Sequence, residues 1–163
     1  MTPDQNLHAD FMAQTLQLAD AAQALGEVPV AALVVLDGQI VGRGHNCNIL
    51  DFDPSAHAEI VAMREAGQTV RNHRLVGATL YCSLEPCVMC VGAMLHARIS
   101  RLVFAADDPK TGAVGGIFDL LGDARHNHRI EVVRGVLQAE ASEQLRAFFR
   151  GKRLAEKERR AVR

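Results

Sequence analysis

Two short stretches of the chain, His-Ala-Glu at 57–59 and Pro-Cys-Val-Met-Cys at 86–90, constrain its fold more than any other feature. The first offers an imidazole and, two residues later, a carboxylate. The second offers two thiols three positions apart, and 29 residues separate His57 from Cys87. A fold that uses these groups together must bring two distant segments of the chain to one point.

The spacing of the two cysteines favours a metal site. A helix that begins at Pro86 places Cys87 and Cys90 on one face, and its N-terminal end stabilises thiolates. His57 lies at the predicted start of another helix, and side chains of a first turn lean back beyond the helix end. Two helix N-termini can therefore converge on one ion. The sequence predicts one Zn²⁺ bound by His57, Cys87 and Cys90, with the fourth tetrahedral position open, as in catalytic zinc sites.

Glu59 is not needed as a ligand in this arrangement, which leaves it free for acid–base chemistry. Zinc lowers the pKa of a bound water towards about 7. A carboxylate beside that water can take its proton and return it to the substrate. His-x-Glu followed by Pro-Cys-x-x-Cys is the known signature of zinc-dependent nucleobase deaminases. We therefore expect Glu59 to be catalytic.

Other interpretations of these residue types are weaker. A Cys-x-x-Cys pair also occurs in redox proteins and in structural zinc sites, but a redox pair would not need His57 or Glu59, and a Cys₄ site would need a second pair. Cys82 is expected to pack in a strand as a small apolar residue. His126-x-His128 lacks a third ligand.

The hydrophobic pattern predicts an α/β fold in the order α-β-β-α-β-α-β-β-α. Apolar residues at helical spacing from Phe11 to Leu25 predict a first helix that ends at Gly26. We expect strands at 31–36, 40–42, 78–82, 101–105 and 130–134, and further helices at 56–67, 87–96 and from about 139, with one more helical turn at 117–121 and Gly151 as a candidate bend. This order predicts one sheet of about five strands with helices on its faces.

Composition narrows the function classes. The 163 residues, 48% of them hydrophobic and 23% charged, suit one globular domain spanning 1–163. Aromatic residues are only 4%, which argues against a surface that stacks many bases. No apolar run is long enough to span a bilayer and the N-terminus does not resemble an export signal, so we expect a cytoplasmic protein without a membrane partner.

The charge is concentrated at the C-terminus. The net charge is −1, yet residues 150–163 hold seven Lys and Arg residues against two Glu residues. A basic end on an acidic body is typical of a contact with a polyanion. The alternative is a solvated helix end whose cations complement the helix dipole.

Beyond the zinc motif, the chain resembles the bacterial tRNA adenosine deaminases of the cytidine deaminase-like superfamily. The resemblance covers nearly the whole sequence and rests on the segments 27–30, 44–46, 53–59, 74–75, 79–81, 84–94, 107–112, 127–129 and 148–150. The Asp-Asp-Pro-Lys-Thr-Gly loop at 107–112 and Met89 point to the tRNA branch. One departure is Gly116, where the resemblance leads us to expect Ser.

The resemblance implies a three-layer α/β/α sandwich with a central mixed sheet, and a homodimer whose pockets use residues of both subunits. It implies hydrolytic deamination of adenosine to inosine at the wobble position of a tRNA anticodon, with tRNA-Arg as the expected tRNA. Asn46 would hydrogen-bond the flipped base. The pocket would be shaped by Val28, Pro29, Val30 and Ala58. The anticodon stem-loop would meet Asp107, Asp108, Lys110, Phe149 and Arg150.

Two other functions stay open at this point. One is deamination of a free nucleobase or nucleoside, which the same zinc chemistry would serve. The other is a non-catalytic, zinc-stabilised RNA-binding subunit, against which Glu59 argues because a structural site needs no acid–base residue.

Overall fold

The structure is a computed structural model that describes residues 1–163. Its elements follow one another in the predicted order and form an α/β fold. They are α1 (Pro3–Ala24), β1 (Ala31–Leu36), β2 (Gln39–His45), α2 (Ala58–Val70), β3 (Thr79–Leu84), α3 (Val88–Ala97), β4 (Arg101–Ala106), β5 (Glu131–Arg134) and α4 (Gln138–Ala161).

The five strands form one mixed sheet in the order β2-β1-β3-β4-β5. β1 pairs antiparallel with both β2 and β3, whereas β3, β4 and β5 run parallel. The parallel half places the carboxyl ends of β3 and β4 side by side, and the loops at 85–87 and 107–116 follow these two ends directly. Such an edge is the usual position of a site in α/β folds.

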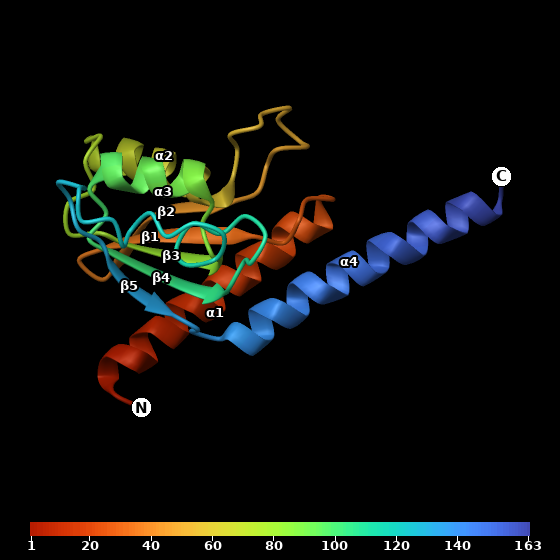
Figure 1. The fold of residues 1–163 in the computed structure, drawn as a ribbon, viewed down its shortest axis with the longest axis horizontal. Coiled ribbons are helices and arrows are strands. Elements are labelled where there is room, and N and C mark those ends of the chain that lie inside the picture. Colours follow the sequence, from red (N-terminus) through yellow and green to blue (C-terminus); the bar gives the residue numbers. More distant parts are fainter.

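Helices cover both faces of the sheet, which confirms the predicted three-layer sandwich (Figure 1). α2 and α3 pack on one face over a core that includes Leu80 and Phe104. α1 and the start of α4 pack on the other face, over a smaller core that includes Phe11 and Tyr81. Alternating residues of each buried strand thus serve two separate hydrophobic layers.

Three details differ from the sequence-based predictions. α1 begins much earlier than Phe11, because Thr2 and Gln5 form a capping box and Pro3 stands at the first helical position. The helical turn predicted at 117–121 is wrong: the N–H groups of Ile117 and Phe118 both donate to the carbonyl of Gly112, so the segment folds back on its own loop. α4 is one continuous helix through Gly151.

None of the helices combines the length and the apolar character that crossing a membrane requires.

Candidate active site

The position of α2 depends on two glycines in β2. A Cβ at Gly44 would collide with the backbone of α2 at Ala58 and Ala62, and a Cβ at Gly42 would collide one turn further on. Glycine therefore lets the helix lie directly on the strand. This contact presents the first residues of α2 at the carboxyl edge of the sheet.

The two helix starts carry the predicted ligands. His57 is the N-cap residue of α2 and Cys87 is the N-cap residue of α3, and neither side chain caps its own helix. Cys90 is buried in the first turn of α3. The ligand atoms of His57, Cys87 and Cys90 all lie within 4.8 Å of one another, so the structure brings these three residues together as a group that could hold a metal ion.

The spacing of the donor atoms fits tetrahedral zinc. Nδ1 of His57 lies 3.5 Å from the sulfur of Cys87 and 3.7 Å from that of Cys90, and the two sulfurs are 3.7 Å apart. Tetrahedral bonds of about 2.3 Å to sulfur and about 2.05 Å to nitrogen would place the sulfurs about 3.8 Å apart and nitrogen about 3.6 Å from each sulfur. Two thiols and one imidazole also match the ligand preference of zinc.

The three groups shift one another's pKa values in the metal-free protein. Hydrogen bonds from Cys90 and then from His57 lower the pKa of Cys87 to about 4, against an opposing contribution from burial. The contact with Cys87 raises the pKa of His57. The lowered pKa of Cys87 favours its thiolate, the form that binds a metal, whereas the contact with Cys87 and burial raise the pKa of Cys90.

Glu59 lies beside the three ligands without belonging to their group. Its side chain is 4% exposed, and Oε2 lies 3.0 Å from the sulfur of Cys90. Oε1 accepts a hydrogen bond from the thiol of Cys82 at 2.6 Å. A buried carboxylate at this place can exchange protons with a small molecule at the open side of the ligand group.

A short network joins the predicted pocket residues to α2. The N–H of Asn46 donates to the carbonyl of Val30, and Oδ1 of Asn46 accepts from the N–H of Ala58 at 3.0 Å. Asn46 therefore lies directly beside His57, with its amide nitrogen available to a ligand. Pro29, Val30 and Ala58 are buried and Val28 is half-buried, so these residues form the floor of the site rather than its rim.

The 107–116 loop is held by a residue that the sequence analysis missed. Glu85 is buried, and it accepts the N–H groups of Asp108, Val114 and Gly116. A Cβ at Gly116 would collide with the carbonyl of Asp108 and crowd the Glu85 carboxylate, which explains glycine where Ser was expected. The sequence held a signal for this role: Glu85 stands directly before Pro86-Cys87, and the backbone N–H groups of the glycine-rich 107–116 loop need acceptors.

Three of the predicted RNA-contacting residues line one hollow, and the two aspartates lie elsewhere in the 107–116 loop. Lys110, Phe149 and Arg150 line one hollow of ≈ 450 Å³ between the loop and α4. Asp108 instead uses its carboxylate within the loop, accepting from the N–H groups of Lys110 and Thr111 and from the Thr111 hydroxyl. Asp107 is exposed at the loop's start.

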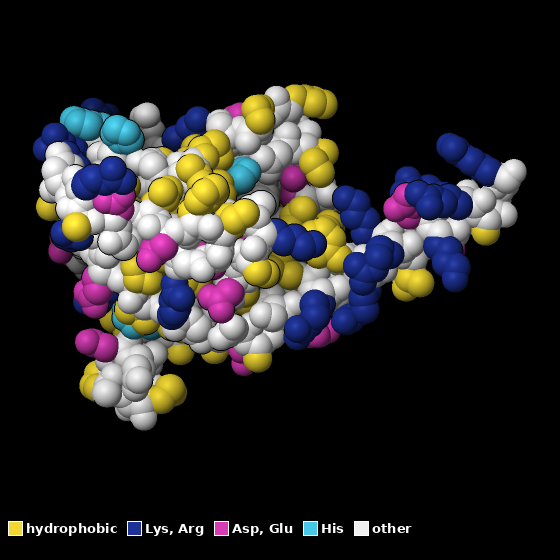
Figure 2. Space-filling model, in the orientation of Figure 1, with side chains coloured by type: hydrophobic (Ala, Val, Ile, Leu, Met, Phe, Trp, Pro, Cys, Tyr) yellow, Lys and Arg dark blue, Asp and Glu magenta, His cyan; other side chains and the backbone are white.

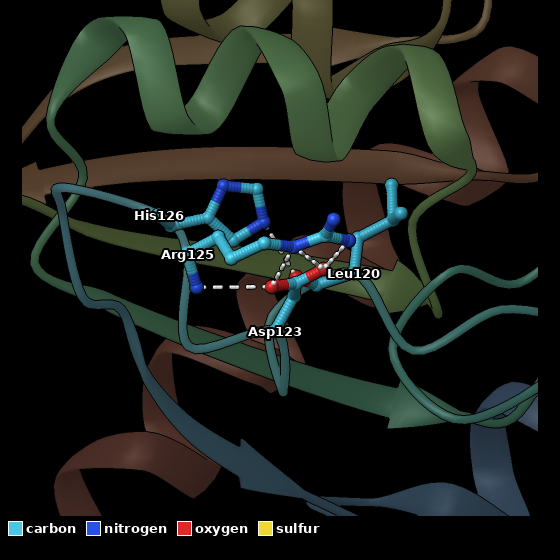
Figure 3. A network of polar contacts seen from close by, with 4 residues as sticks. All are labelled: Leu120, Asp123, Arg125 and His126. Carbon is cyan, nitrogen blue, oxygen red and sulfur yellow. Dashed lines mark hydrogen bonds and ion pairs between the residues drawn. The ribbon is translucent and has the colours of Figure 1, made fainter.

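The histidines at 126 and 128 each have a hydrogen-bond partner of their own. Nε2 of His126 bonds the carbonyl of Leu120 at 2.7 Å, in a turn where Arg125 also forms an ion pair with Asp123 (Figure 3). Nε2 of His128 bonds the carbonyl of Ile99 at 2.7 Å. Neither histidine belongs to the group of His57, Cys87 and Cys90 that could hold a metal ion.

Comparison with known proteins identifies the class to which this site belongs. The family model of the cytidine and deoxycytidylate deaminase zinc-binding region matches residues 5–106. The chain therefore belongs to the cytidine and deoxycytidylate deaminase family of zinc-binding domains.

Relatives of known name show to which branch of this family the chain belongs. The tRNA-specific adenosine deaminase of Haemophilus influenzae is 49% identical over 153 residues, which are 93% of this chain and 88% of that protein. The Bacillus subtilis protein of the same name is 44% identical over 140 residues, covering 86% and 87%. Within the family, the chain belongs to the branch that contains the bacterial tRNA-specific adenosine deaminases.

Solved structures agree on the fold. A structure from a study of A-to-I editing by tRNA:A34 deaminases has a TM-score of 0.81 at 40% identity and covers 83% of this chain and 99% of that chain. The guanine deaminase of Nitrosomonas europaea has a TM-score of 0.69 at 28% identity and covers 84% and 81%. The fold is thus shared between enzymes named for RNA and for a free base.

Proposed function

We propose that this protein is a zinc-dependent hydrolase that deaminates adenosine to inosine at the wobble position of a tRNA anticodon. The observation that carries the proposal is the buried carboxylate of Glu59 beside the His57, Cys87 and Cys90 group. The tRNA-specific adenosine deaminases at 44–49% identity supply the substrate class. The whole chain, 1–163, would act as one domain.

The chemistry requires a nucleophile and a proton carrier. Zinc held by His57, Cys87 and Cys90 would supply a Lewis acid that makes a water molecule reactive enough to attack C6 of adenine. Glu59 takes the proton of that water and delivers it to N1 of the base. Glu59 then helps a second proton reach the amino nitrogen, so that the C6–N bond breaks and ammonia leaves. The balance is adenosine plus water to inosine plus ammonia.

The pocket residues would hold the base rather than react with it. The side-chain amide of Asn46 has its oxygen engaged by Ala58, so its NH₂ group is the part that can donate to an acceptor on the adenine edge. Val28, Pro29, Val30 and Ala58 would pack against the base. Nucleotides of an anticodon loop are already unpaired, so one can enter such a pocket at modest cost.

Neighbouring nucleotides would bind outside the pocket. Lys110, Phe149 and Arg150 share one hollow that Arg146 and Arg153 also line. It offers four cations for phosphates, and Phe149, which is 41% exposed, for stacking. Asp107 lies at the same edge, and Asp108 would act by fixing the conformation of the loop that carries Lys110. These positions favour RNA over a free nucleobase.

We further propose that the protein works as a homodimer in the cytoplasm. A groove of ≈ 1040 Å³ runs between α2 and α3. Its apolar part is contributed by Ile60, Met63, Leu75, Ala93 and Ala97. Two of its lining residues, Ile60 and Ala93, each lie three positions after a predicted metal ligand, so one end of the groove leads towards the site. Sedimentation equilibrium of the zinc-loaded protein tests this, and a monomer at micromolar concentration would contradict it.

The test of the function is a measurement of ammonia and inosine with purified zinc-loaded protein and a tRNA-Arg anticodon stem-loop. Free adenosine, cytidine and guanine are assayed in parallel. We expect inosine at the wobble position alone. Turnover of a free base or nucleoside with the stem-loop untouched would keep the zinc chemistry and overturn the RNA substrate. Stem-loop binding without turnover of any substrate would favour the non-catalytic subunit.

A further inference from the structure

Cys82 has a contact that the proposed reaction does not use. It lies in β3, is fully buried, and faces the layer of α2 and α3 together with Leu80. Its sulfur lies 2.6 Å from Oε1 of Glu59 and 2.8 Å from the carbonyl of Leu84. The thiol thus contacts the carboxylate of Glu59 inside the buried layer.

Cys82 is not a member of the ligand group. That group consists of His57, Cys87 and Cys90, and Cys82 reaches it only through Glu59. Burial and the neighbouring Glu59 carboxylate raise the pKa of Cys82 well above its ordinary value. Cys82 therefore keeps its proton at neutral pH and can act as a hydrogen-bond donor.

The two oxygens of Glu59 have different surroundings. Oε2 faces the sulfur of Cys90 at 3.0 Å, whereas Oε1 faces Cys82. A cysteine that binds a metal is a thiolate and has no proton to donate. In the zinc-loaded protein, Cys90 therefore no longer donates to Glu59. Cys82 is then the one thiol that still donates a hydrogen bond to Glu59, and it bonds only Oε1.

We propose that Cys82 is a positioning residue, which anchors Oε1 of Glu59 through an S–H···O hydrogen bond and so leaves Oε2 turned towards the reacting water and base. This inference rests on the proposed function, because it gives Glu59 the role of proton carrier. An anchored carboxylate presents one oxygen in a fixed direction, whereas a free carboxylate rotates.

Two variants separate the hydrogen bond from simple packing. Cys82→Val fills the space without a donor, and Cys82→Ser keeps a donor in a smaller side chain. Hydrogen bonds to charged groups are strong enough that we expect Cys82→Val to lower kcat about 10- to 100-fold. KM for the stem-loop and the zinc content should stay unchanged, and Cys82→Ser should recover most of kcat.

A spectroscopic measurement tests the contact without any substrate. In the zinc-loaded protein, the infrared difference between wild type and Cys82→Val isolates the S–H stretching band of Cys82. We expect this band to move to higher frequency in Glu59→Ala, because the carboxylate acceptor is lost. A band that stays in place would mean that the thiol bonds Leu84 alone, which would overturn the proposal.

The remaining outcomes are also decisive. A fall in zinc content in Cys82→Val would make Cys82 a ligand, and equal losses of kcat in folded Cys82→Val and Cys82→Ser would make it a packing residue; either result overturns the positioning role. Thermal unfolding of each variant shows that it is folded. If wild type deaminates no substrate, the proposed function fails, while the shift of the S–H band still decides whether Cys82 anchors Glu59.

Discussion

Three carboxylates are buried in this chain, and their partners distinguish their roles. Glu27 accepts the N–H groups of Ile49 and Leu50, and Glu85 accepts three N–H groups of the 107–116 loop. These two residues satisfy backbone donors and hold loops beside the site. Glu59 accepts no backbone N–H group, and its partners are the thiols of Cys82 and Cys90. A buried carboxylate without a structural task is a candidate for chemistry.

Replacement of Glu59 tests this distinction at the level of one residue. Glu59→Gln keeps the shape of the side chain but removes the proton carrier, so we expect kcat to fall about 10²- to 10⁴-fold. Inosine formation and zinc per chain are measured on the same sample. Zinc content should stay at one ion per chain. Turnover within a factor of a few of wild type would assign proton transfer to another group.

Loss of a ligand should have a different signature. In Cys87→Ala one of the three ligands is missing, and we expect zinc, activity and part of the folding stability to be lost together, because metal binding stabilises the folded state. Metal analysis and thermal unfolding with and without a chelator measure this. A Cys87→Ala protein with a full complement of zinc would show that the ligand set is wrong.

At the scale of elements, the site depends on how closely α2 approaches β2. Gly44→Ala puts a methyl group against the backbone of Ala58 and Ala62 and should push α2 outward. Overpacking of this kind costs about 1–3 kcal/mol, and each kcal/mol lowers Tm by about 2–4 °C in a chain of this size. Zinc affinity should fall too, since His57 begins α2.

The matched control for Gly44→Ala lies in another helix. Gly151 is in α4 and has open space where its Cβ would stand, so Gly151→Ala should leave stability unchanged or raise it by up to about 1 kcal/mol. Calorimetry of both variants tests the pair. Equal Tm values for Gly44→Ala and wild type would show that the strand and helix can separate without cost.

The contact between α1 and β3 predicts a dependence on pH. Nδ1 of His8 and the hydroxyl of Tyr81 are 2.8 Å apart, and burial, aided by Arg101, lowers the pKa of His8 in the folded state. The unfolded chain, with a His pKa of about 6.5, binds the proton first. The free energy of unfolding should therefore fall as the pH drops below about 6.5 towards the folded-state pKa.

Comparison with a variant isolates the contribution of His8. His8→Gln cannot titrate in this range, so its free energy of unfolding should fall less steeply between pH 7.5 and 5.5 than that of wild type. Urea denaturation at several pH values gives both slopes. Identical slopes would assign the acid sensitivity to other groups.

At the scale of the whole molecule, local sequence patterns were enough to predict the order of the elements and the ligand group. Periodicity predicted the order of the nine elements, and the spacing of Cys87 and Cys90 predicted which side chains would meet His57. Individual contacts between different elements could not be predicted, because no local sequence pattern indicates them. The hydrogen bond between Cys82 and Glu59 joins a strand to a helix, and the carbonyl of Gly112 draws residues 117–118 away from a helix. Both depend on tertiary packing, which competes with local preference.

Exposure and positive charge are concentrated in the C-terminal part of α4. Its residues from Arg150 onward are all exposed, and the helix extends beyond the sandwich with Lys and Arg side chains along it (Figures 1 and 2). Such a projection buries almost no apolar surface, so folding alone does not explain it. A row of cations beside the hollow of Lys110 and Phe149 favours a contact with phosphates.

Removal of residues 153–163 tests this contact. We expect weaker binding of the tRNA stem-loop, a higher KM and an unchanged kcat, because the removed residues lie outside the pocket. Each lost phosphate contact should reduce the slope of log affinity against log salt by about 0.7–0.9. The full-length double variant Lys157→Glu, Arg160→Glu should behave in the same way, whereas Leu154→Ala, which leaves the charge unchanged, should bind like wild type. If the truncated protein keeps its affinity and salt dependence, the cations of α4 only complement the dipole of an exposed helix end.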